Sequence, residues 1–393
     1  MNSLEILDLS YNKLQGEIRT SLGNICTLNA LYLSHNNFSG ELSSFTQNTS
    51  WCNGHPLRLL YLSDNQIKGM SSNLHVFSFL EYLDLSNNQL KGEIPESVGL
   101  LSQLNDLCLH GNNLGGVITE SHFKNLSNLK TLSLFGNSLT LRISTRWIAP
   151  FQLQNLEMAS CMVGPSFPNW LHNQHKSDTL NISNCGLSGF IPEWFWSLIR
   201  NMTFMDISHN NFVGEIPKLP LKFNYMPLII LTSNNFEDAV PSFFSQASTL
   251  YLLGNKFSNL VPLLYGQIEN EGFDILDISN NRLGGTLPDC WSHLNSLELV
   301  NLSNNNLSGE IPTSIGQLVN LEPLVLRNNS FGELPSSLAN CSHLLLLDVS
   351  ENKLSGSIPS WVGENLGQLQ VLSLRMNTFY GSLPLQLHHL AHI

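Results

Sequence analysis

The sequence predicts an α/β repeat solenoid, with a parallel inner sheet, second short extended segments and short helical turns on the outside. Three observations support this prediction. The pattern L-x-x-L-x-L-x-x-N recurs from end to end at a mean spacing of about 24 residues. A proline returns at a fixed place in most units. Of the 393 residues, 73 are Leu and 46 are Asn. We therefore expect residues 1–393 to form a single solenoid of about sixteen units, uncapped at both ends.

The inner strand of each unit is expected at the L-x-L step, as in Leu83-Asp84-Leu85. Side chains alternate along a strand, so both leucines point to one side and the x residue points to the other. A strand this short cannot cover its own apolar face, and stacking of successive coils buries it. Each buried Leu contributes roughly 1.5–3 kcal/mol, which offsets part of the entropy lost in ordering the backbone.

The position that follows each inner strand is Asn in most units and Cys in two. An amide both donates and accepts, so we predict that it satisfies buried main-chain groups of its own coil and of the next. At the two Cys positions we expect a small buried thiol with a weak donor, and no redox role. These ladder positions are Asn12, Asn36, Asn65, Asn88, Asn112, Asn137, Cys161, Cys185, Asn210, Asn234, Asn255, Asn281, Asn305, Asn329, Asn352 and Asn377.

A second extended segment is expected after the ladder position, where many units read L-x-G-x-I-P, as at 307–312. Gly allows a turn with positive φ, and Pro fixes φ and disfavours helix before it. The rest of each unit, for example 97–101, is too short for more than a turn or two of helix.

The combined phrase L-x-x-L-x-L-x-x-N-x-L-x-G-x-I-P resembles the plant-specific leucine-rich repeat of receptor-like kinases and receptor-like proteins. Further phrases resemble receptor-like proteins of the ethylene-inducing-xylanase receptor group. They are Ser-Trp-Cys-Asn at 50–53, Pro-Phe-Gln-Leu at 150–153, Pro-Glu-Trp-Phe-Trp at 192–196, Leu-Pro-Asp-Cys-Trp at 287–291 and Val-Leu-Arg-Asn-Asn at 325–329.

The resemblance implies a twisted solenoid ectodomain carried on a single transmembrane helix, at the extracellular side of the plasma membrane. Such a protein senses peptide, protein or glycan ligands in defence or development, and it signals through partner receptor-like kinases because it has no kinase of its own. In this chain Met1 lies directly inside a repeat, and no signal peptide or apolar run of about 18 residues is present. We interpret the chain as an internal fragment of an ectodomain or a truncated product.

Two cysteines, Cys26 and Cys52, lie in the outer parts of successive units, and this pair also recurs in the family. We expect a disulfide between them, which would add about 3–4 kcal/mol in the chain-entropy model. Cys290 and Cys341 lie two units apart, too far for an unstrained bridge. Cys108 lies between two strand leucines and is expected to face outward, which the sequence does not explain.

Nine N-x-[ST] sequons occur, about as many as chance gives for this composition. Asn181 and Asn301 fall between strand leucines, where a glycan would obstruct the outward face. The extracellular location implied by the resemblance makes the others glycosylation candidates. They are Asn37, Asn48, Asn125, Asn201, Asn306, Asn328 and Asn340.

Outward positions of the predicted sheet are the candidate ligand-binding surface, because aromatic and Arg side chains tend to carry binding energy. The candidates are Tyr32, Tyr61, Tyr82, His110 and Phe135 in the first half of the chain, with Arg327 and Arg375 in the second. Acidic residues share the position between the strand leucines. They form either a surface attractive to basic ligands or solvated filler of the Leu-Asp-Leu-Ser phrase.

Composition and motifs exclude several functions. A net charge of −12 makes nucleic acid an unsuitable partner. The chain lacks the nucleotide-binding, metalloprotease, hydrolase and kinase motifs, and its histidine pairs lack neighbouring ligands, so we expect no enzyme, cofactor or metal. The leading hypothesis is an extracellular ligand-recognition segment. The alternatives are a soluble inhibitor of microbial cell-wall hydrolases, similar to the polygalacturonase inhibitors, or a truncated product without independent function.

Overall fold

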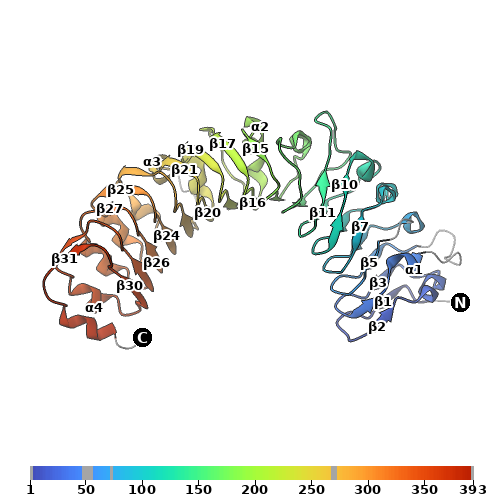
Figure 1. The fold of residues 1–393 in the computed structure, drawn as a ribbon, viewed down its shortest axis with the longest axis horizontal. Helices are drawn as coiled ribbons and strands as arrows, with labels where there is room; N and C mark the ends of the chain where they lie inside the picture. Colours follow the sequence, from blue (N-terminus) through green and yellow to red (C-terminus); the bar gives the residue numbers. More distant parts are fainter. Residues whose placement is uncertain (1–2, 47–55, 71–73, 267–271, 391–393) are drawn as a thin grey trace. The chain divides into compact units, whose positions relative to one another are not determined.

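The computed structural model describes residues 3–46, 56–70, 74–266 and 272–390. The chain divides into two compact units, unit 1 (Met1–Ser188) and unit 2 (Gly189–Ile393). Both are built from the same repeating coil, which consists of an inner strand, a turn, a second extended segment and a short helical turn (Figure 1). The predicted α/β repeat solenoid fold is confirmed in each unit. The continuity of a single solenoid over 1–393 stays a prediction.

The inner strands of unit 1 run parallel, and their middle leucines are in register, as in the pairs Leu31↔Leu60 and Leu60↔Leu83. Each strand is three residues long and is centred on the first leucine of the L-x-L step, so it begins one residue earlier than the step, as in Tyr82–Asp84. The strands are β1 (Ile6–Asp8), β3 (Ala30–Tyr32), β5 (Leu59–Tyr61), β6 (Tyr82–Asp84), β8 (Asp106–Cys108), β11 (Thr131–Ser133), β13 (Asn155–Glu157) and β14 (Thr179–Asn181).

Unit 2 repeats this arrangement with its own parallel inner strands. Pro323 opens one of them and has no N–H to donate, so Glu298 O accepts a backbone hydrogen bond from Glu322 alone. The strands are β16 (Phe204–Asp206), β18 (Leu228–Ile230), β20 (Thr249–Tyr251), β22 (Ile275–Asp277), β24 (Leu299–Asn301), β26 (Pro323–Val325), β28 (Leu346–Asp348) and β30 (Val371–Ser373).

Second strands follow the ladder position and pair in small parallel sheets, such as β23-β25-β27. At Gly309, φ is +80°, which is the left-handed turn that glycine adopts without strain. These strands are β2 (Gln15–Glu17), β4 (Asn37–Ser39), β7 (Lys91–Glu93), β9 (Asn113–Gly115), β10 (Val117–Ile118), β12 (Thr140–Leu141), β15 (Ser188–Gly189), β17 (Asn211–Glu215), β19 (Asn235–Ala239), β21 (Lys256–Asn259), β23 (Gly284–Thr286), β25 (Asn306–Gly309), β27 (Ser330–Phe331), β29 (Ser355–Gly356) and β31 (Thr378–Phe379).

Outer segments form short helical turns, mostly 3-10, and Pro95 and Pro312 directly precede two of them in extended conformation. The α-helices are α1 (Leu42–Thr46), α2 (Glu193–Leu198), α3 (Val261–Leu264) and α4 (Trp361–Asn365). The 3-10 turns are η1 (Thr20–Asn24), η2 (Leu74–Phe77), η3 (Glu96–Leu100), η4 (Glu120–Phe123), η5 (Asn169–Asn173), η6 (Ile199–Asn201), η7 (Ser242–Gln246), η8 (Trp291–His293), η9 (Thr313–Gln317), η10 (Ser336–Asn340) and η11 (Leu385–Leu390).

The core of each unit lies between the inner strands and the outer turns. The middle strand leucines Leu31, Leu60 and Leu83 are at most 1% exposed. In unit 2 a row of phenylalanines runs through the core beside them. Phe236 stacks on Phe212 and on Phe257, with ring centroids 6.2 and 6.3 Å apart. Aromatic rings bury large areas and gain further from stacking, so this row ties successive coils together.

Asparagine side chains cross-link the coils at the ladder position. Asn88 Nδ2 donates to Leu62 O of the preceding coil at 2.9 Å, and to Leu85 O and Ser86 O of its own coil. Its Oδ1 accepts a hydrogen bond from Ile67 N of the preceding coil at 3.0 Å. One amide therefore satisfies backbone groups that the turn and the coil boundary would otherwise leave buried and unpaired.

Cysteine occupies the same position twice, and both thiols are fully buried. Cys161 Sγ donates to Leu134 O at 3.6 Å, and Cys185 Sγ donates to Met158 O at 3.1 Å. Each thiol therefore donates to the carbonyl of the preceding coil that an amide would contact. Burial raises the pKa of Cys161 to about 12, so this side chain stays a neutral donor.

The ladder amides yield a stability prediction. We expect Asn210→Ala or Asn305→Ala to lower the free energy of unfolding by about 1–3 kcal/mol, because buried carbonyls and an amide lose their partner. At Asn305 the lost bonds include those to Ile278 O and from Leu283 N. Urea titration followed by circular dichroism measures the change, with the exposed neighbour variant Asn306→Ala as control. Equal midpoints for Asn305→Ala and Asn306→Ala would contradict the prediction.

Candidate ligand-binding surface

The outward face of the unit 1 sheet presents two side chains per strand, one on each side of the buried leucine. Tyr32 on β3 and Tyr61 on β5 occupy the same register position. Their rings stack with centroids 5.1 Å apart and an interplanar angle of 15°. The stack is half-buried, so a flat aromatic surface is held rigidly on an otherwise open sheet.

The third tyrosine, Tyr82 on β6, lies at the other outward position of its strand. Tyr82 is in register with Leu59, while Tyr61 is in register with Asp84. The three tyrosines are therefore on adjacent strands without forming one column. Burial raises the pKa of Tyr61 to about 12, with further contributions from Tyr32, Asp106, Tyr82 and Asp84. The Tyr61 hydroxyl is consequently neutral and available as a donor at any physiological pH.

His110 and Phe135 follow strands β8 and β11 and form a second aromatic stack. Their ring centroids are 4.4 Å apart, and the rings are within 9° of parallel. Ser133 Oγ donates to Glu157 Oε2 at 2.9 Å and lies 3.0 Å from His110 Nδ1. A hydroxyl has one hydrogen, so the imidazole must donate to the serine. The roles of Ser133 and His110 are thus the reverse of those in a hydrolase triad, in which the imidazole accepts the hydroxyl proton.

Cys108 lies between these two groups, half-buried on the same face. Burial raises the pKa of its thiol to about 12, and the carboxylates of Asp84, Asp106 and Glu157 add to the shift. A thiol is nucleophilic only as the thiolate. The outward cysteine that the sequence left unexplained is therefore an unreactive thiol in a locally negative environment.

The two candidate arginines lie in unit 2. Arg327 Nη2 donates to Glu351 Oε1 at 2.8 Å, so its charge is partly matched within the chain. Arg375 is exposed, and its backbone carbonyl accepts the amide of Glu351. The tyrosine set and the arginine set thus belong to different units.

The recurrent acidic position has a structural role that sequence reasoning missed. Asp84 Oδ1 accepts from Ser86 N at 3.0 Å and from Ser86 Oγ at 2.6 Å. Asp277 accepts the same two hydrogen bonds from Ser279, and Asp348 accepts them from Ser350. At two other units Asn takes this position and accepts them from Ser183 and Ser303. The side chain stabilises the turn that ends the strand. The sequence signal was the Ser that follows two residues later.

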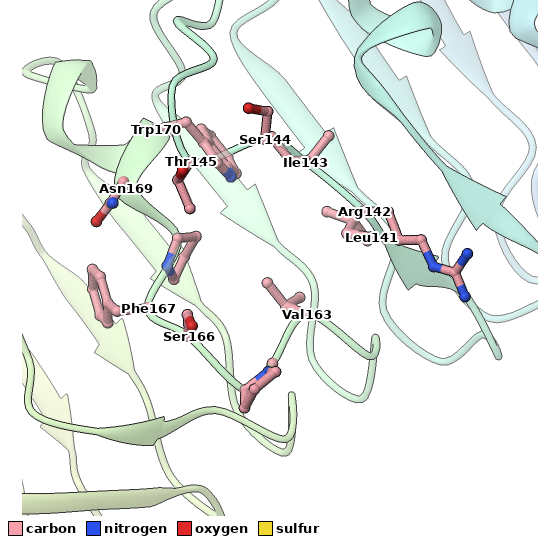
Figure 2. Close-up of a pocket in the computed structure, with 13 residues that line it drawn as sticks. Leu141, Arg142, Ile143, Ser144, Thr145, Val163, Ser166, Phe167, Asn169 and Trp170 are labelled. Atoms are coloured by element: carbon pink, nitrogen blue, oxygen red, sulfur yellow. The ribbon is translucent and has the colours of Figure 1, made fainter.

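A separate hollow of about 470 Å³ lies within unit 1 (Figure 2). Its walls are residues 141–145 and 163–170, which include the exposed Arg142 and the buried rings of Phe167 and Trp170. Trp170 also packs edge-on against Trp147, with centroids 6.0 Å apart. The sequence did not predict this hollow, because the phrase Gly-x-Ile-Pro is absent from residues 139–150 and also from the units on both sides, at 114–119 and 162–168.

The remaining predicted positions are distributed as follows. Cys26 is disulfide-bonded, and its predicted partner Cys52 lies outside the described residues, as does Asn48. Cys290 and Cys341 are free thiols. Among described residues, no group of three or more His, Cys, Asp or Glu side chains could hold a metal ion. Within the same residues, no helix is long and apolar enough to span a membrane. The other sequon asparagines are exposed; they are Asn37, Asn125, Asn201, Asn306, Asn328 and Asn340.

Comparison with known proteins gives family matches along the chain. A model described as leucine rich repeat matches residues 272–331, and a second of the same description matches 3–25, 27–48, 79–101, 178–198 and 343–365. Receptor-like protein EIX2 of Solanum lycopersicum is 37% identical over 183 residues, 46% of this chain and 18% of that protein. Receptor-like protein 39 of Arabidopsis thaliana is 34% identical over 291 residues, 67% of this chain and 32% of that protein. The chain thus spans at most about a third of these curated relatives.

Solved structures with the same architecture include two plant receptors in complex with a ligand. The leucine-rich-repeat ectodomain of the receptor kinase GASSHO1/SCHENGEN3 from Arabidopsis thaliana, in complex with CASPARIAN STRIP INTEGRITY FACTOR 2, matches with a TM-score of 0.81 and 28% identity. That match covers 98% of this chain and 46% of the other. The plant peptide hormone receptor RGFR1 in complex with RGF2 matches with a TM-score of 0.71 and 25% identity, over 98% of this chain and 68% of the other.

The Cys108 environment yields a reactivity prediction. At pH 8 we expect iodoacetamide to modify Cys108 at least tenfold more slowly than glutathione, because its thiolate is disfavoured by burial and by neighbouring carboxylates. Asp84→Asn removes one of these charges and should speed the modification. Peptide mapping by mass spectrometry measures both rates. A Cys108 rate equal to that of glutathione would contradict the prediction, and a rate unchanged by Asp84→Asn would contradict the contribution of the carboxylates.

Proposed function

Because this chain is a leucine-rich-repeat protein similar to the plant receptor-like proteins, we propose that it is the extracellular ligand-recognition segment of such a receptor. Its full-length parent would sit in the plasma membrane and act in defence or developmental signalling. The chain itself would bind a peptide, protein or glycan without catalysing a reaction on it.

The main support for this proposal is the stacked pair Tyr32–Tyr61 on the open face of the unit 1 sheet. Folding requires only the buried leucine of each strand, so tyrosines at the outward positions are not needed for the core. Tyrosine supplies a rigid apolar surface and a polar tip at low entropic cost, which is the combination that binding surfaces favour. Tyr82 on the next strand and the His110–Phe135 stack extend the aromatic surface within the same unit.

A structural relative that is bound to a co-receptor supports the involvement of partner receptors in signalling. It is the Arabidopsis receptor kinase HAESA in complex with the peptide hormone IDA and the co-receptor SERK1, with a TM-score of 0.65 and 26% identity. We extend the proposal to partner receptor-like kinases for the parent of this chain. Arg327 and Arg375 are its proposed polar anchors in unit 2, and glycans are proposed only at the exposed sequons.

Substitution of the tyrosines tests the proposal. We expect Tyr32→Ala/Tyr61→Ala/Tyr82→Ala to weaken elicitor binding at least tenfold, since the variant loses the aromatic surface and keeps the buried leucines. Biolayer interferometry would measure the immobilised chain against an ethylene-inducing xylanase, the elicitor named by the resemblance, and against a chitin oligosaccharide.

Tyr225→Ala/Tyr380→Ala is the matched control, because both tyrosines are exposed and belong to unit 2. Circular dichroism should show the same fold for both variants. Intact binding in the triple variant, or equal losses in the two variants, would refute a role for the tyrosine surface.

A further inference from the structure

The inner strands of unit 2 are drawn as arrows in Figure 1, and the first position of β22, β24, β26, β28 and β30 is apolar and lies on the outward face; we call this column the apolar stripe. Ile275 is in register with Leu299, Pro323 with Leu346, and Leu346 with Val371. Thr249 on β20 separates the stripe from two further apolar residues on β16 and β18. The stripe residues are half-buried, and Val371 is 47% exposed. The stripe consists of Ile275, Leu299, Pro323, Leu346 and Val371, and the two residues beyond Thr249 are Phe204 and Leu228.

The fold does not require apolar residues at this position. In unit 1 the same register column is apolar or aromatic only in its first four strands, and it is polar in the next four, which pair in the same parallel register; the polar residues are Asp106, Thr131, Asn155 and Thr179. The core is supplied in both units by the neighbouring middle residue of each strand, which is Leu in most strands and Met205, Ile229 or Val300 in three strands of unit 2. A row of partly exposed apolar side chains that folding does not demand indicates a binding surface.

Acidic side chains border the stripe on one side. Asp274, Glu298 and Glu322 directly precede β22, β24 and β26, and their backbones are adjacent, because Glu298 N donates to Asp274 O and Glu322 N to Glu298 O. Glu298 and Glu322 are exposed. Within the described chain, none of the three carboxylates forms an ion pair. Adjacent strands lie about 4.8 Å apart, so the three charges form a continuous negative border.

Other charged groups around the stripe leave this border unneutralised. Asp277 and Asp348 lie on its other side, where they cap their turns through Ser279 and Ser350. Arg327 lies beyond β26 and is paired with Glu351. The exposed Arg375 follows β30, at the end of the stripe away from the three border carboxylates. The surface therefore combines an apolar centre with a negative margin over β22, β24 and β26, and it complements a ligand that is both apolar and cationic.

We propose that this stripe binds an extended peptide segment in which apolar side chains alternate with lysine or arginine. The proposal rests on the recognition role proposed above and names the class of ligand. A polyproline II helix repeats every three residues, or about 9.3 Å. Two strand spacings amount to about 9.6 Å. Such a peptide lying across the strands places one side chain per turn on the apolar stripe and another beside the acidic border.

A synthetic probe tests this inference. The probe is a fluorescein-labelled peptide with the sequence Leu-Pro-Lys repeated four times, and the control peptide has Glu in place of each Lys. Fluorescence anisotropy with the 393-residue chain should show binding of the lysine probe, at least tenfold tighter than that of the glutamate peptide. Affinity should fall as salt is raised, because the border charges are exposed and are screened.

Two variants divide the contributions. We expect Leu299→Gln/Leu346→Gln and Glu298→Gln/Glu322→Gln each to weaken probe binding at least tenfold. The matched control, Glu310→Gln/Glu333→Gln, removes two exposed carboxylates away from the stripe and should stay within twofold of wild type. Circular dichroism checks that each variant folds. The acidic substitutions are on the surface and test the inference even if the leucine variant is unstable.

The proposal is overturned if the lysine probe does not bind, if both peptides bind equally, or if the stripe variants bind like the control. It is also overturned if sedimentation shows a dimer of wild-type chains that Leu299→Gln/Leu346→Gln dissolves, because a second copy then occupies the stripe. Tyr32→Ala/Tyr61→Ala/Tyr82→Ala separates the two proposals. If that variant loses elicitor binding and still binds the probe normally, both proposals are supported. If it loses elicitor binding but wild type does not bind the probe at all, only the inference about the stripe is defeated.

Discussion

The hydrogen bonds of the ladder asparagines are the constraint on which both units depend. A coil of about two dozen residues must turn sharply after a three-residue strand, and that turn leaves carbonyls and an amide without backbone partners. Asn88 shows the solution, since one side chain contacts carbonyls of two successive coils and accepts an amide hydrogen of the preceding coil. Stacking leucines supply the driving force for burial, but leucines alone would tolerate many offsets between coils. The directional amide bonds fix the offset, and the strand register follows from it.

Fixed register has a consequence for the outward face. Once coils are stacked with constant offset, each outward position becomes a column of side chains about 4.8 Å apart. The same residue type in successive units then produces a surface with one chemical character. In unit 1 this brings Tyr32 onto Tyr61, and in unit 2 it lines up Ile275 with Leu299 and Leu346 with Val371. The two units share a backbone plan and carry different surfaces, aromatic and acidic in one and apolar with an acidic margin in the other.

Several features around these columns have no signature in the repeat pattern. The residue before each ladder position has positive φ, and although Asn and Gly are common there, other types also adopt it, for example Tyr11, His35 and Glu351. The turn imposes that conformation, and no single residue type is selected for it. The same turn directs the side chain before one ladder position toward the equivalent side chain of the next coil. Tyr11 and His35 show this, because their rings stack with centroids 4.2 Å apart. The hollow beside Trp170, between residues 141–145 and 163–170, is likewise unmarked by the repeat pattern.

The sequence by itself determined the repeat, the position of every inner strand and the residues that cross-link the coils. It could do so because those features depend on interactions within one coil or between adjacent coils, and each such interaction leaves a periodic trace. It also marked Tyr32, Tyr61 and Tyr82 as outward. Only the tertiary structure decided that Tyr82 lies outside the column of the other two, that Arg327 is held by Glu351, and that Asp84 caps a turn. Those outcomes depend on contacts between particular side chains on adjacent strands or turns. Such contacts are set by the three-dimensional packing of the coils, and the repeat pattern in the sequence does not specify them.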